Sequence, residues 1–247
     1  MLYDSRVEWT VQVPRLVGDL AVVREVVLSD VSTLFELLSD PAVTEHLSSP
    51  PPSESAFVGF IGWAHRQRAA GNGVCFGIVP HGLEQAVGII QVRALEPSFF
   101  VAEWGFAVGV AFWSTGVFIA AANLVAQFAF ETLKVNRLEA RAVSQNARGQ
   151  AALQKLGARP EAALSRAFRK GARRDQQLLW TLREEDWRQR PLLGRRLDAA
   201  QATEQVAQAV QQTRRLMEAE TPRQVPSAAR DYPFFVTGAN DEPERRR

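Results

Sequence analysis

From Phe99 to Val108 the chain reads Phe-Phe-Val-Ala-Glu-Trp-Gly-Phe-Ala-Val, and this stretch decides its fold. Aromatic and β-branched residues surround one carboxylate, Glu103. This pattern predicts a buried strand that carries one side chain able to take part in chemistry. A turn follows at Phe112-Trp113-Ser114-Thr115-Gly116. After the turn, apolar residues recur at the three- and four-residue spacing of a helix: Phe118, Ala122, Val125, Ala129 and Leu133.

The turn is placed where the start of that helix could hold a phosphate. Ser114 or Thr115 can cap the helix, and Gly116 lets a ligand approach the backbone. A helix N-terminus has unpaired N–H groups and the positive end of the helix dipole, and both favour an anion. Most turns of this kind only cap their helix, so the turn alone leaves both interpretations open.

Further elements follow from the same periodicities. The segment 136–143 predicts a second strand, and 146–158 predicts a helix that Asn146 can cap and Gly157 can close. Asp30 is expected to cap a helix near the N-terminus, and Pro41 to end it. The other predicted elements are strands at about 20–27, 75–79, 86–93, 163–168 and 177–182, and helices at 30–39 and 54–69.

These motifs, in this order, resemble those of the GNAT superfamily of acyl-CoA-dependent N-acyltransferases, and within it the RimJ/RimL-like branch. The resemblance covers about the first three quarters of the chain. It implies a mixed α/β fold with a twisted, mostly antiparallel central sheet of about six to seven strands and helices on both faces. The motifs that carry the resemblance are Ala102–Phe106, Trp113–Gly116, Arg137–Arg141 and Asn146–Gly157.

The resemblance also implies a site for acetyl-CoA as co-substrate. Its pantetheine arm would lie along the strand from Glu103 to Val108, and its pyrophosphate on the turn from Ser114 to Phe118. The residues expected to bind it are Phe106, Ala107, Val108, Trp113, Ser114, Thr115, Gly116, Val117, Phe118, Asn146 and Arg148.

Similar proteins transfer the acetyl group directly to an amine in a ternary complex, which requires a group that takes a proton from the amine. Glu103 is the first candidate for this catalytic base and Glu139 the second. The alternatives are that Glu103 only pairs with an arginine and that Glu139 is structural. The expected acceptor is a primary amine, either a protein N-terminus or a small molecule.

Two departures from the family pattern prompt an alternative function. Trp113 and Phe118 stand at the first and last places of the phosphate turn, where the family has Gln or Arg and a small residue. Gly149 and Leu153 stand where many relatives have a residue that protonates the leaving thiolate, and neither can donate a side-chain proton. The chain could therefore be a degenerate GNAT domain that binds CoA or a protein without turnover.

Composition limits the remaining possibilities. The single cysteine, Cys75, excludes an internal disulfide and is expected to be a buried thiol, and we expect no metal site. Neither Met1–Thr10 nor the apolar stretch Val117–Phe130 predicts a signal peptide or a membrane span, so we expect a cytoplasmic protein. The net charge is only +2, and the arginine clusters lack interleaved aromatics, so nucleic acid is not an expected partner. The histidines His46, His65 and His81 share no spacing and are expected to be structural.

Domain boundaries follow from shifts in composition. Residues 1–190 are predicted to form the acyltransferase domain, 191–220 an amphipathic helical extension and 221–247 a flexible tail. The extension could pack on its own domain, cover the cleft or join two subunits, so a homodimer is one of the possibilities. Phe57, Phe60 and Trp63 are expected in the core, with contact to substrate as the alternative.

Overall fold

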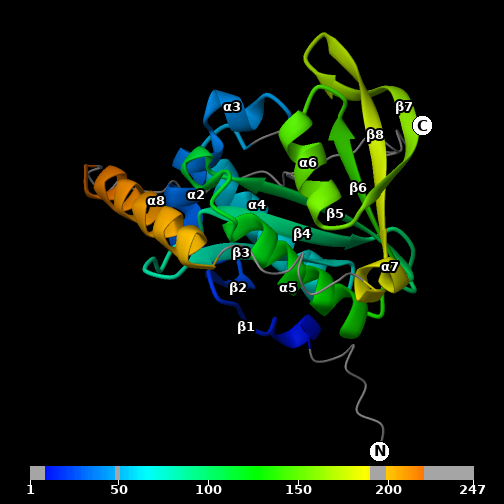
Figure 1. Cartoon of the computed structure of the whole chain (residues 1–247), viewed down its shortest axis with the longest axis horizontal. Helices are drawn as coiled ribbons and strands as arrows, with labels where there is room; N and C mark the ends of the chain where they lie inside the picture. The colour runs from blue at the N-terminus through cyan, green and yellow to red at the C-terminus, as the bar shows by residue number, and fades with distance from the viewer. Residues whose placement is uncertain (1–8, 48–50, 190–198, 220–247) are drawn as a thin grey trace, which may run out of the picture.

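The computed structural model describes residues 9–47, 51–189 and 199–219, and its central element is one twisted eight-stranded sheet (Figure 1). The strands are β1 (Leu16–Val17), β2 (Ala21–Glu25), β3 (Gly73–Pro80), β4 (Gly88–Ala94), β5 (Val101–Val108), β6 (Arg137–Val143), β7 (Arg159–Lys170) and β8 (Arg173–Arg183). The helices are η1 (Leu28–Asp30), α2 (Val31–Leu38), α3 (Pro41–Thr44), α4 (Glu54–Ala69), η2 (Val110–Phe112), α5 (Val117–Glu131), α6 (Ala147–Lys155), α7 (Glu184–Gln189) and α8 (Ala199–Ala219).

The sheet has the order β1-β2-β3-β4-β5-β6-β8-β7, and β5 and β6 are its one parallel pair of neighbours. This arrangement confirms the predicted mixed α/β fold with a mostly antiparallel sheet. The strand that the sequence did not predict is β1, because two residues are too few for a recognisable alternation.

Two apolar cores lie on the two faces of the sheet. Trp104 and Val108 of β5 belong to the core that α5 covers, whereas Ala107 belongs to the core beneath α2 and α4. This division follows from the alternation of side chains along a strand. By the same alternation, Glu103 points to the face that carries α2 and α4.

Most predicted elements are confirmed near their expected bounds, but Asp30 and Pro41 act differently from the prediction. Asp30 stands at the N-cap position of α2 without capping it. Its fully buried carboxylate instead accepts two 2.8 Å hydrogen bonds from Arg24 and one each from the backbone N–H groups of Val27 and Ala86. Pro41 starts α3 at its first turn, where a proline is tolerated and Asp40 caps the helix.

The C-terminal helix α8 packs on its own domain. Val206, Val210 and Thr213 are buried, and Thr33 of α2 donates a hydrogen bond to Met217. Figure 1 shows α8 along the side of the sheet, close to α2. The helix of the extension therefore packs on its own domain near η2, which was one of the three predicted alternatives. The predicted tail, 221–247, lies outside the described residues.

Candidate active site

A cavity of about 1030 Å³ lies where β5 and β6 separate. Their parallel ladder pairs only three positions and ends at Glu103 and Glu139, although β5 continues to Val108 and β6 to Val143. The cavity is lined by Glu103–Val108 on one side and by Ala140–Val143 on the other. Its size is at the upper end of the range of roughly 300–1,000 Å³ that is usual for small-molecule and cofactor sites.

The edge of β5 that faces this gap offers backbone hydrogen-bonding groups. β5 stays paired with β4 along its whole length, and the N–H of Gly109 bonds to the Val87 carbonyl just beyond it. Because successive residues of an antiparallel strand face opposite neighbours, the N–H and C=O groups of Trp104 and Phe106 point toward the gap. An extended ligand could therefore pair with β5 as a further strand would.

The start of α5 forms one end of the cavity. Gly116 has a φ of 86°, a left-handed conformation that glycine adopts at little cost, and it stands at the N-cap. The Thr115 hydroxyl accepts from the Val117 N–H and donates to the Phe112 carbonyl, but the N-cap residue is Gly116 and neither Ser114 nor Thr115. Helix geometry gives the N–H groups of Phe118 and Ile119 no intrahelical acceptor, so they are available to an anion.

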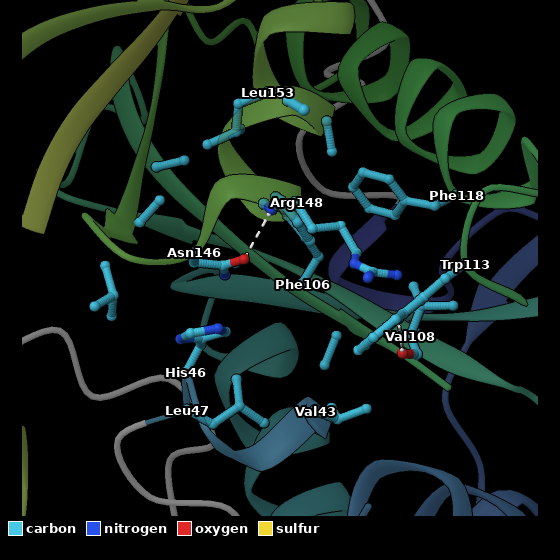
Figure 2. Close-up of a pocket in the computed structure, with 18 of the residues that line it drawn as sticks. Val43, His46, Leu47, Phe106, Val108, Trp113, Phe118, Asn146, Arg148 and Leu153 are labelled. Carbon is cyan, nitrogen blue, oxygen red and sulfur yellow. Dashed lines mark hydrogen bonds between the residues drawn. The ribbon is translucent and has the colours of Figure 1, made fainter. Parts of the chain in front are cut away.

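Trp113 and Arg148 meet at the same end of the cavity. The Trp113 indole donates a 2.9 Å hydrogen bond to the Val108 carbonyl, which fixes the ring beside the end of β5. The guanidinium of Arg148 lies 3.7 Å from the centre of that ring. Arg148 is held there by α6, which Asn146 caps as predicted, by accepting a 2.8 Å hydrogen bond from the Gly149 N–H. Figure 2 shows Arg148 and Trp113 reaching into the cavity from opposite elements.

Phe118 lies at the cavity wall, where it packs on Phe106. The two ring centres are 4.3 Å apart, and both side chains are partly exposed. Both rings line the cavity near the start of α5 (Figure 2).

Nine of the eleven residues predicted to bind acetyl-CoA line this one cavity. The two others, Thr115 and Val117, are buried and do not line the cavity. The nine residues are Phe106, Ala107, Val108, Trp113, Ser114, Gly116, Phe118, Asn146 and Arg148.

The two predicted catalytic carboxylates differ in position. Glu103 lines the cavity, is buried, accepts a 2.6 Å hydrogen bond from Arg93 and lies 3.8 Å from the guanidinium of Arg141. Glu139 is not among the residues that line the cavity, and Arg137 holds its carboxylate at 2.8 Å. The pairing with arginine that sequence analysis gave as the alternative for Glu103 is thus present, and a catalytic role for either residue stays a prediction.

On the opposite wall of the cavity, contact of Trp63 with substrate was an alternative prediction, whereas the other residues were not predicted as part of the site. This wall comes from α3 and the residues after it, with Val43, His46 and Leu47, and from α4, with Trp63. Of the three aromatic residues of α4 singled out in the sequence, Trp63 lines the cavity, whereas Phe57 and Phe60 are fully buried in the core. The proline-initiated turn at Pro41 was the signal that could have located this wall.

The two positions without a proton donor have structural explanations. A side chain at Gly149 would place its Cβ 2.7 Å from the amide of Asn146, so glycine preserves the helix cap. Leu153 is 1% exposed and belongs to the core beneath α6. Both positions line the cavity, and neither residue there can donate a side-chain proton.

The family assignment follows from comparison with known proteins. Residues 21–159 match the family model of the acetyltransferase (GNAT) domain, which is more than half of the chain. The chain therefore belongs to the GNAT acetyltransferase family, and it is an N-acetyltransferase. Members of this family use acetyl-CoA. No curated protein matches the chain in sequence.

Solved structures support the fold. RimJ of Mycobacterium smegmatis in complex with CoA-disulfide is 17% identical with a TM-score of 0.62, covering 79% of this chain and 92% of that one. A GNAT-family acetyltransferase from Bacillus anthracis is 17% identical with a TM-score of 0.61, covering 70% and 99%. A protein from Vibrio cholerae, provisionally described as a ribosomal-protein-serine acetyltransferase, is 18% identical with a TM-score of 0.61, covering 69% and 97%.

None of the described helices combines the length and the apolar character that crossing a membrane requires. The described part of the chain also holds no group of three or more His, Cys, Asp and Glu side chains placed to bind a metal ion.

Proposed function

We propose that this chain transfers the acetyl group of acetyl-CoA directly to a primary amine within a ternary complex. The observation that carries the proposal is the cavity between β5 and β6, which joins an open strand edge to the start of α5. An acetyl donor that bound along the edge would bring its thioester toward Glu103, where the two strands meet.

The chain's own groups fit acetyl-CoA at this site. The N–H and C=O groups of Trp104 and Phe106 suit an extended pantetheine amide chain. The N–H groups at the start of α5 and the guanidinium of Arg148 suit phosphates. When it is bound, acetyl-CoA supplies an activated acyl carbon, and the protein holds it and excludes water.

The acceptor would enter from the side of α3 and α4. Val43, Leu47 and Trp63 give this side an apolar surface, while Glu103 contributes a carboxylate beside Arg93 and Arg141. Glu103 is our proposed base, which takes a proton from the amine before or during attack. Glu139 could act only at longer range, since the cavity wall does not include it.

A protein N-terminus and a small-molecule amine are both compatible with this cavity. The fold likeness to RimJ and to the provisionally described serine acetyltransferase favours testing an N-terminal serine first. Membership of the RimJ/RimL-like branch, a cytoplasmic location and a homodimer stay predictions.

The alternative is a domain that binds CoA or a protein without turnover. It is favoured by the phenyl ring of Phe118 in the cavity and by the absence of a donor at Gly149 and Leu153. The two functions differ in what they predict for acetyl-CoA with and without an amine.

Calorimetry and a thiol-release assay separate the two functions. The enzyme should bind acetyl-CoA and release CoA thiol faster when an amine is added. Binding without any amine-dependent release would favour the alternative, and no binding at high micromolar acetyl-CoA would remove both the enzyme and the CoA-binding form of the alternative. Glu103→Gln should then lower turnover at neutral pH far more than it weakens binding of acetyl-CoA, and an unchanged rate would exclude Glu103 as the base.

A further inference from the structure

His46 occupies a position in the cavity that the mechanism above does not use. It follows α3 and lines the same cavity as Glu103 and Arg148. Figure 2 shows its ring projecting inward from this segment. The Nδ1 atom is buried and has no hydrogen-bond partner within the described parts of the chain. Because Nδ1 is buried, a ligand in the cavity would meet the other nitrogen of the ring, Nε2.

The surroundings of His46 keep its imidazole neutral at neutral pH. Burial lowers the pKa of His46 from its ordinary value of 6.5, and the cations Lys170 and Arg173 lower it further. The carboxylates of Glu45 and Asp175 oppose this shift without reversing it. A neutral imidazole is the form that can accept a proton.

The tip of the β7–β8 hairpin holds this segment in place. Lys170 donates a 2.6 Å hydrogen bond to the Thr44 carbonyl, two residues before His46. Arg173 lies 3.9 Å from the Glu45 carboxylate and also pairs with Asp175. The cations that keep His46 neutral are therefore fixed in position by their own contacts, so they do not depend on a bound ligand.

We propose that His46 is a catalytic residue that takes the first proton, from the acceptor ammonium group, and leaves to Glu103 the second proton, which the amine loses during attack. This inference rests on the proposed acetyltransfer. The Glu103 carboxylate already accepts from Arg93 and faces Arg141. The His46 ring, by contrast, lines the cavity on the side of α3, where its Nε2 can meet the ammonium group.

The proton balance of this step is simple. One N–H bond of the ammonium group breaks as an N–H bond to the imidazole forms, and the imidazolium later returns that proton to solvent. The neutral amine then forms the C–N bond as the C–S bond breaks. The second proton lost from nitrogen passes by way of Glu103 to the sulfur, which leaves as CoA thiol.

The test uses the full chain, acetyl-CoA and three amine probes: a peptide with a free N-terminal serine, spermidine and an aminoglycoside. His46→Gln keeps a polar side chain of similar reach but cannot take a proton at neutral pH. His81→Gln is the matched control, because His81 is exposed, lies outside the cavity and bonds to the Gly18 carbonyl.

We expect His46→Gln to lower kcat/KM at pH 7 by about 100-fold or more, the usual contribution of a general base. Binding of acetyl-CoA should stay within about threefold of the wild-type Kd. Added imidazole should restore part of the activity of His46→Ala, which a structural role would not allow. His81→Gln should behave as the wild type does.

The pH profile gives a second measurement. Activity needs the neutral imidazole, so wild-type kcat/KM should fall as the pH drops through the pKa of His46, below 6.5. NMR titration of the His46 ring should report the same pKa. If His46→Gln fails to fold, the wild-type pH profile and the NMR titration still test the proposal. A difference between the pKa from kcat/KM and the pKa from NMR would overturn it.

The inference and the proposed function can fail separately. Suppose that the wild type turns over a probe. A His46→Gln rate within about threefold of the wild-type rate, with an unchanged pH profile, would then overturn the role of His46 alone. Binding of acetyl-CoA without turnover of any probe by the wild type would overturn the acetyltransfer and the role of His46 together.

Discussion

Removing the guanidinium of Arg148 tests whether the end of the cavity near α5 binds phosphate. Arg148 stacks on Trp113 at 3.7 Å, so it is already oriented before any ligand arrives. A hydrogen bond to a charged group contributes about 1.5–3 kcal/mol. Since each 1.4 kcal/mol is a factor of ten in affinity, we expect Arg148→Ala to weaken acetyl-CoA binding by about 10- to 150-fold.

The fold should be little affected by this substitution. A cation–π contact at a partly exposed site contributes about 0.5–1 kcal/mol, which is small against the stability of a domain. Arg148→Lys should give an intermediate loss of affinity, because lysine keeps the charge but not the planar stack on Trp113. Arg188→Ala is the matched control, because Arg188 is exposed on α7, outside the cavity, and pairs with Glu184.

Calorimetry with two ligands isolates the phosphate contact. Acetyl-CoA carries phosphates, whereas S-acetylpantetheine does not, so the loss caused by Arg148→Ala should vanish with the second ligand. The loss should also shrink at high salt, since exposed charges are screened. An equal loss with both ligands, or no loss with acetyl-CoA, would refute the idea that Arg148 holds a phosphate.

Three further predictions concern other parts of the structure. Asp30→Ala should lower the free energy of unfolding by about 3–5 kcal/mol in chemical denaturation, because it leaves the Arg24 guanidinium without its buried partner. Cys75 should resist iodoacetamide in the native protein and react once the chain is unfolded, because burial raises the pKa of its thiol and blocks access. Phe118→Ala should lower the free energy of unfolding by about 0.5–1.5 kcal/mol or more, because the contact with Phe106 is lost. In calorimetry, this variant should bind acetyl-CoA as tightly as the wild type or more tightly.

Each of these predictions has an outcome that contradicts it. An unchanged denaturation midpoint for Asp30→Ala would mean that the Arg24 charge finds water or another partner. Alkylation of native Cys75 at the rate of a free thiol would show that its strand opens. Weaker binding of acetyl-CoA by Phe118→Ala would mean that the ring supports the ligand and does not crowd it.

The sequence alone determined the local elements of this protein. Periodicity placed α4 at the same bounds, Glu54–Ala69, that the structure has. Asn146 was identified as a cap because an Asx side chain before an apolar run satisfies the first N–H groups of a helix. The order of strand, turn, helix and strand also located most of the half of the cavity that we propose to bind phosphate, since its residues are close together in the chain.

Only the tertiary structure decided how these elements make a site. The separation of β5 from β6 depends on how each strand pairs with its other neighbour, which no local pattern encodes. Arg148 meets Trp113 across 35 positions of sequence, and His46 faces a wall built from β5 and α6. A histidine or an arginine has no periodicity of its own, so its role depends on partners that the fold brings from distant parts of the chain.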